Sequence, residues 1–152
     1  MSREIKFRGI ALDKYTTFTY GHYVFNKAQG IHIIVDEYGD MWNIKPNTVG
    51  QFTGLHDKNG KEIYEGDIVK SNWNNSARKY IGQNYEIKFG KWWHSGGFED
   101  SYGGIGFYAQ PTIGDEYYID SEMRSADNIP CDRNDDNYYD VVVIGNIHEK
   151  RE

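Results

Sequence analysis

The chain has 152 residues, of which 38% are hydrophobic and 16% aromatic, and its formal net charge is −6. This length suits one domain, or one domain with a smaller appendage, and the acidic balance differs from that of a typical basic nucleic-acid-binding domain. Leucine occurs only at Leu12 and Leu55, which argues against long amphipathic helices and favours a β-rich fold.

The first third of the chain is predicted to be an antiparallel β-meander over residues 1–49. Side chains of different character alternate from Phe18 to Phe25, as in a strand with two distinct faces. Asn26–Gly30 and Glu37–Asp40 have the composition of turns. The expected strands are therefore 18–25, 31–35 and 41–42.

The stretch from Gln51 to Lys70 contains two turns of defined chemistry. The Asn59-Gly60 pair suits the positive-φ positions of a type I′ turn, or the left-handed end of a slightly longer loop. Glu65-Gly66-Asp67 is a second turn before the β-branched pair Ile68-Val69. The pattern predicts strand, tight turn, short strand, tight turn, strand. The residues assigned structural roles in the turns are Asp57, Asn59, Gly60, Gly66 and Asp67, with both aspartates accepting nearby backbone N–H groups.

The rest of the chain contains two clear strand patterns. Alternation over Tyr85–Phe89 predicts a half-buried strand, and the apolar β-branched run Val141–Ile144 predicts a central strand buried on both faces. A short helix is predicted over 119–126. The glycines of 103–106 lack a strand–helix context and are predicted to form a turn or bulge.

Three blocks of the sequence resemble the signature of the YopX family, whose members are small proteins of bacteriophages and prophages. The central block comprises Gly50–Leu55, Asp57–Tyr64 and Glu65–Val69. The outer blocks are Arg3–Arg8 and Val143–Glu149. The similarity therefore extends over the whole chain in outline.

The resemblance implies an all-β, mainly antiparallel fold with an SH3-like small barrel in the C-terminal part and at most one or two short helices. Residues 1–49 are then an N-terminal subdomain, and 50–152 form the barrel with an acidic insert around 95–137. This insert looks long for the family, and Gly9–Asp13 replaces an aromatic-acidic pair that such families often have. The resemblance brings no activity and no catalytic residues.

Basic and aromatic residues are interleaved in the segment 70–94. Its five basic residues stand against Glu86 as the single acidic one. Basic side chains neutralise phosphates and aromatic rings stack on unpaired bases, so the segment is a candidate nucleic-acid interface. In the alternative interpretation the lysines are solvated and the tryptophans belong to the core, which the exposure of Trp73, Trp92 and Trp93 would decide. The candidate residues are Lys70, Trp73, Arg78, Lys79, Lys88, Lys91 and Trp92.

The segment from Asp115 to Asp140 holds nine acidic residues and two basic ones. Within it, Asp132–Asn137 superficially resembles the start of a calcium loop. Asn137 stands where the loop requires glycine, however, and Val143 where it requires a bidentate glutamate. A solvated acidic loop is expected, and neither a metal site nor a cofactor is predicted.

No catalytic motif is recognisable in the sequence. The five histidines are scattered, and there is no His-Glu-x-x-His pattern, paired cysteine or phosphate-binding glycine loop. The single Cys131 excludes a disulfide or a multi-cysteine zinc site within one chain. His56 and His94, near predicted turn tips, are expected to be surface residues. We therefore expect a protein that is not an enzyme.

Exposed aromatic side chains, sheet edges and an acidic loop favour a binding module. We expect it to serve a protein partner from the host or the phage, or to assemble with its own copies as a homo-oligomer. No apolar run approaches the roughly 18 residues needed to cross a bilayer, and the N-terminal residues lack the apolar core of a secretion signal. The expected location is the cytoplasm of a bacterial host cell, with no membrane contact.

Overall fold

The computed structural model describes residues 4–71, 84–96, 100–112, 124–125 and 141–149. The strand pairs with a defined register in these residues are all antiparallel. The helical element among them is the short 3-10 helix η1, Pro46–Thr48. No helix in this part of the chain has the length and apolar character needed to span a bilayer. The predicted all-β, mainly antiparallel fold is confirmed.

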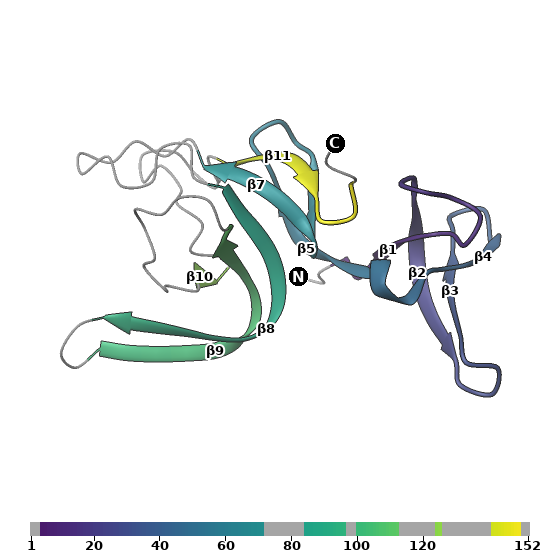
Figure 1. Ribbon diagram of the computed structural model, residues 1–152, viewed down its shortest axis with the longest axis horizontal. Coiled ribbons are helices and arrows are strands. Elements are labelled where there is room, and N and C mark those ends of the chain that lie inside the picture. The colour runs from purple at the N-terminus through teal and green to yellow at the C-terminus, as the bar shows by residue number, and fades with distance from the viewer. Residues whose placement is uncertain (1–3, 72–83, 97–99, 113–123, 126–140, 150–152) are drawn as a thin grey trace. The chain divides into compact units, whose positions relative to one another are not determined.

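The first sheet has six strands in the order β4-β3-β2-β1-β5-β6 (Figure 1). Its strands are β1 (Phe7–Ile10), β2 (Phe18–Asn26), β3 (Ile31–Val35), β4 (Met41–Asn43), β5 (Gly50–His56) and β6 (Glu62–Tyr64). β2, β3 and β4 form the meander expected from the alternating pattern. Along β2, Tyr23 packs against the core whereas Tyr20 and Val24 are exposed, because successive side chains point to opposite faces.

The second sheet has five strands in the order β10-β9-β8-β7-β11. Its strands are β7 (Asp67–Ser71), β8 (Asn84–Gly96), β9 (Asp100–Pro111), β10 (Arg124–Ser125) and β11 (Val141–Asn146). Figure 1 shows β8 and β9 as a long curved hairpin, and Gly90 pairs with Gly106 along it. Over the described residues neither sheet closes into a barrel, so the SH3-like barrel expected in the C-terminal part is not confirmed.

The chain divides into two compact units, each with its own core. The first unit comprises residues 1–54 and 148–152, and the second comprises 55–147. In the first core, the buried residues are Ala11, Ile34 and Ile44. In the second core they are Ile63, Val69, Tyr85, Ile87, Ala109 and Val141. Burial of these apolar side chains is the main favourable contribution to folding in each unit.

The turn-rich stretch adopts the order of elements that its sequence predicts. β5, β6 and β7 follow one another with two tight connections. In the first connection, the N–H of Asp57 donates to the carbonyl of Lys61 (2.7 Å), and the N–H of Gly60 donates to the carbonyl of Asp57 (2.9 Å). Gly60 has φ 82° at the left-handed position, so the loop is the longer of the two predicted geometries.

The run Val141–Ile144 was expected at the centre of a sheet, and this prediction is wrong. In the sheet formed by the described residues, β11 pairs with β7 at one end of the strand order. Its remaining backbone groups are partly satisfied by the loop after β5: Lys58 N–H donates to the carbonyl of Val141 (3.1 Å), and Val143 N–H to the carboxylate of Asp57 (3.0 Å). Ile144 is 50% exposed, so the strand is not buried on both faces either. An apolar β-branched run favours a strand, but it does not determine where that strand lies in a sheet.

Two further predictions are corrected by strand pairing. Arg124 and Ser125, placed in the predicted helix 119–126, form β10 against β9, while the remaining residues of that helix lie outside the described ones. The glycines of 103–106 lie within β9 and pair with residues of β8, so they form neither a turn nor a bulge. A glycine-rich segment can join a sheet when a long neighbouring strand supplies its hydrogen bonds.

Candidate functional site

The described members of the predicted nucleic-acid interface do not share one face. Lys70 pairs with Asn84 across β7 and β8, so alternation places Lys70 and Lys88 on the same face, together with Glu86. Lys91 lies on the opposite face of β8, because it is three residues from Lys88. These residues therefore do not form one continuous basic surface.

Several predicted features lie outside the described residues. The backbone of Trp92 pairs with that of Gly104 in the β8–β9 hairpin, but its side chain is outside the description. Nucleic-acid binding and the character of the acidic insert thus stay predictions. The described part of the chain contains no group of three or more His, Cys, Asp or Glu side chains arranged to hold a metal ion. The features outside are Trp73, Arg78, Lys79, Cys131, the acidic loop 126–140 and the side chains of Trp93 and His94.

The aspartates of the turn-rich stretch are buried acceptors of backbone hydrogen bonds. Asp57 is 3% exposed, and its Oδ1 accepts the N–H groups of Asn59 and Lys61, each at 2.9 Å. Asp67 is also buried and accepts the N–H of Tyr64 at 2.8 Å. Both carboxylates therefore hold the backbone of the turns, as the sequence predicts.

A cleft of about 680 Å³ lies in the first unit, and the sequence did not predict it. Residues 4–6 before β1, the first half of β2, the turn after β3 and Trp42 of β4 line it. Four aromatic rings and three carboxylates contribute to this lining, against one lysine. The rings are those of Phe18, Tyr20, Tyr38 and Trp42, and the charged residues are Glu4, Lys6, Asp36 and Glu37.

Gly21 permits the close approach of β2 and β3 beside the cleft. It lies on β2 next to His22, which pairs with Val35 of β3. A Cβ atom added at Gly21 would overlap the carbonyl oxygen of Val35, a backbone atom that cannot rotate away. Only glycine therefore fits this position without separating the two strands.

Asp36 organises the turn that forms one wall of the cleft. Its Oδ1 accepts the backbone N–H groups of Tyr38 and Asp40, each at 2.9 Å, and its Oδ2 accepts the indole N–H of Trp42 at 2.9 Å. The bond from Trp42 is the largest cause that lowers the pKa of Asp36. It outweighs the desolvation that raises this pKa, and the two backbone N–H groups lower it further. Asp36 is therefore a fixed negative charge that orients Trp42.

Tyr38 stands at the rim of the same turn with its side chain 82% exposed. A hydrogen bond to the carboxylate of Glu37 is the largest cause that raises the pKa of Tyr38 above its ordinary value of 10.0. The negative charges of Glu37 and Asp36 act in the same direction. The rim thus combines an exposed aromatic ring with a negative electrostatic potential.

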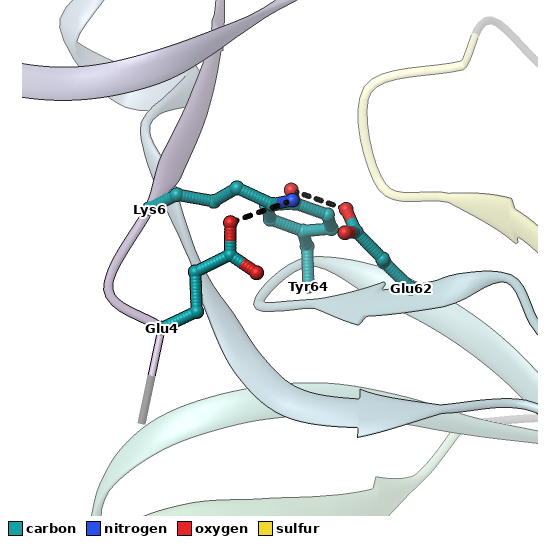
Figure 2. A network of polar contacts seen from close by, with 4 residues as sticks. All are labelled: Glu4, Lys6, Glu62 and Tyr64. Atoms are coloured by element: carbon teal, nitrogen blue, oxygen red, sulfur yellow. Dashed lines mark hydrogen bonds and ion pairs between the residues drawn. The ribbon is translucent and has the colours of Figure 1, made fainter. Parts of the chain in front are cut away.

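The lysine of the cleft lining forms an ion pair. The ammonium of Lys6 lies 3.3 Å from a carboxylate oxygen of Glu4 (Figure 2). The hydroxyl of Tyr64 donates to Glu62 at 2.8 Å, a hydrogen bond within the second unit that is drawn in the same figure. Because Lys6 is balanced by Glu4, the charges of Asp36 and Glu37 set the net sign of the cleft.

One aromatic wall of the cleft already contacts a guanidinium group. The Cζ atom of Arg8, a buried residue of β1, lies 4.1 Å from the centre of the Phe18 ring. This distance is well inside the range of favourable cation–π contacts. The first unit therefore contains an arginine stacked on a ring that also lines the cleft.

Comparison with known proteins supplies a family match. The model of the family described as YopX protein matches residues 6–152, which is essentially the whole chain. No curated protein sequence shows significant similarity to the chain.

Proposed function

The chain belongs to the YopX family, and we propose that it is a non-catalytic binding module for a protein partner. The observation that carries this proposal is the cleft of the first unit, which combines exposed aromatic side chains with fixed charges. The resemblance to small phage and prophage proteins favours an accessory role in the cytoplasm of a bacterial host. The partner is then a host or phage protein.

Binding fits the chemistry of the cleft better than catalysis does. The carboxylate of Asp36 accepts three hydrogen bonds, and its pKa is lowered, so it is a weak proton acceptor. None of the hydrogen bonds of the described residues joins His22, which also lines the cleft, to a carboxylate. An orienting partner of that kind is what a general base requires.

The lining residues suit a macromolecular partner. Tyrosine and tryptophan are enriched at protein interfaces because each offers a large rigid surface with one polar group. Besides Tyr38, the cleft exposes 46% of Tyr20 and 57% of Ile5. Exposed aromatic and aliphatic side chains around a recess are typical of the central contacts that contribute most to binding.

The test compares two exposed tyrosines of the first unit. Tyr38, in the cleft, and Tyr15, outside its lining, are 82% and 84% exposed. Wild type, Tyr38→Ala and Tyr15→Ala are immobilised and exposed to lysate of infected host cells, and the captured protein is then purified and titrated against each. We expect Tyr38→Ala to weaken binding by about tenfold or more and Tyr15→Ala to leave it unchanged.

Two results would contradict the proposal. One is a partner that binds all three variants equally, since it would not use the cleft. The other is the absence of any protein retained by wild type above the level retained by Tyr38→Ala. Sedimentation of the purified chain alone covers self-assembly: a dimer that Tyr38→Ala dissociates would identify a second copy as the partner.

A further inference from the structure

We propose that the cleft of the first unit binds an arginine side chain of the partner protein, together with the apolar residues beside it. This inference rests on the proposed function and specifies the chemistry of the partner. It is carried by the sign of the charges in the cleft, by the orientation that the turn gives to its groups, and by the exposed rings.

The charges select a cation. Three carboxylates and one lysine line the cleft, and that lysine is paired with Glu4. An anionic partner group would meet the fixed charge of Asp36 and the carboxylate of Glu37 at the rim. A cation gains from both, and more so when the partner covers the cleft and excludes water.

The aromatic rings favour arginine over lysine. A guanidinium is planar, stacks on ring faces and can donate two parallel hydrogen bonds to one carboxylate, whereas an ammonium is a compact and strongly hydrated charge. Tyr38 adjoins Glu37 in sequence and both residues line the cleft, so one guanidinium can approach a ring and an acid group together. The stacking of Arg8 on Phe18 shows that a ring of this cleft already makes such a contact.

The volume of the cleft leaves room for more than one side chain. About 680 Å³ lies within the range of roughly 300–1,000 Å³ that is usual for sites holding drug-sized ligands. Ile5 and Phe18 supply apolar surface that a guanidinium alone would leave in water. Residues flanking the arginine can cover this surface, so the expected ligand is a short segment with apolar neighbours.

The test uses three capped tripeptides that differ only at the central residue: acetyl-Leu-Arg-Leu-amide and its lysine and citrulline counterparts. Citrulline keeps the size of arginine without the charge. Each is titrated into ¹⁵N-labelled protein, with the indole N–H of Trp42 as the reporter because it donates to Asp36 inside the cleft. We expect the arginine peptide to bind about tenfold more tightly than the citrulline peptide, and more tightly than the lysine peptide.

Variants localise the effect. Glu37→Gln and Tyr38→Ala should each weaken binding of the arginine peptide several-fold. Asp13→Asn and Tyr15→Ala change exposed residues outside the cleft lining and should leave its affinity unchanged. Equal binding of arginine and citrulline peptides would refute a cation in the cleft. Equal binding of the arginine and lysine peptides would refute the choice of arginine. Absence of a response at Trp42 would refute binding in the cleft.

The outcome also separates this inference from the proposed function. If a partner is captured in a Tyr38-dependent way but the peptides show no preference for arginine, the arginine hypothesis is refuted and the proposed binding function stands. If the peptides show an arginine-specific response but no partner is captured, the arginine preference of the cleft stands and the result counts against the proposed binding function.

Discussion

The loop that begins at Asp36 and the loop that begins at Asp57 have the same internal hydrogen bonds, although they lie in different units. In each, the aspartate N–H donates to the carbonyl four residues later, at 2.9 and 2.7 Å. In each, Oδ1 accepts the N–H groups two and four residues later, all at 2.9 Å. Gly39 and Gly60 occupy the same position with φ 82°. The shared pattern is Asp-x-x-Gly.

The loops differ in what the second carboxylate oxygen contacts. Oδ2 of Asp57 accepts the backbone N–H of Val143 at 3.0 Å and thereby holds β11, a strand 86 residues away, from a buried position. Oδ2 of Asp36 accepts the indole of Trp42 at 2.9 Å and orients a side chain of the cleft. The same local structure thus anchors a strand in the second unit and positions a cleft residue in the first. The difference lies in the third hydrogen-bond donor, which is Val143 N–H for Asp57 and the Trp42 indole for Asp36.

The largest expected effect comes from removing the two carboxylates. Asp57→Ala leaves three backbone N–H groups, of Asn59, Lys61 and Val143, without their acceptor in part-buried hydrogen bonds, and should reduce the free energy of unfolding by about 3 kcal/mol. In Asp36→Ala the N–H groups that lose their acceptor can bond to water, so the free energy of unfolding should fall clearly less than in Asp57→Ala. The Trp42 indole resonance should also shift, because its acceptor is lost. Urea unfolding followed through amide resonances of β11 and of β3 measures each unit separately.

Asp13→Ala is the matched control for both changes. Its carboxylate is exposed and makes only a long ion pair to Lys14 at 3.9 Å, so no loss of stability is expected. Equal destabilisation by Asp57→Ala and Asp36→Ala would contradict the distinction between the two loops.

Replacement of the two loop glycines should destabilise the protein less than loss of the Asp57 carboxylate does, and by the same amount in both loops. Both Gly39 and Gly60 have φ 82°, and a Cβ atom at either would meet nothing within 4 Å. Alanine at either position should therefore reduce the free energy of unfolding by about 1 kcal/mol, the strain of a left-handed backbone at a residue with a Cβ atom. Thermal unfolding of Gly39→Ala and Gly60→Ala tests this, with the asparagine variants as controls expected to lose less. Unequal losses would show that one loop is held by contacts beyond its own hydrogen bonds.

Much of the fold could be predicted from sequence because its signals are local. The alternation along β2 and the Asn59-Gly60 and Gly66 turns depend on a few neighbouring residues, and the predicted strands appear there. The position of β11 could not be predicted in this way. Its apolar run indicates burial, but the contribution of Asp57 to its outer edge depends on a contact between distant segments.

The cleft escaped sequence reasoning for the same reason. The sequence predicts a turn at Glu37–Asp40 and a strand with two distinct faces over Phe18–Phe25, but no local pattern indicates that these two segments and residues 4–6 surround one recess. The register of β2 against β3, which places His22 opposite Val35, brings them together. The Asp-x-x-Gly pattern at 36–39 and 57–60 was a local signal for the two loops, but the same pattern at 100–103 lies within β9, so the pattern alone does not identify the cleft.

The predicted basic surface shows the opposite failure. Lys88 and Lys91 looked like neighbours because they are close in sequence. An interval of three residues in a strand places side chains on opposite faces, so the same pattern that predicted the strand also argued against a joint surface. Applying the period of two to the charges, as well as to the apolar residues, would have separated them.

The smallest expected effect is a shift in the titration of Asp36. Its pKa is lowered in the folded chain from the ordinary 3.8, so the folded state binds this proton less readily than the unfolded state. The stability that the carboxylate contributes is therefore complete above 3.8 and is lost as the pH falls through the lower folded pKa. A ¹³C titration of the Asp36 carboxyl should have its midpoint below that of the urea-unfolded chain, and the Trp42 indole proton should move with the same midpoint. In Asp36→Asn the Trp42 resonance should no longer follow that titration. A folded midpoint at or above the unfolded one would mean that the indole bond is too weak to orient Trp42, and the comparison of the two loops would then reduce to their backbone.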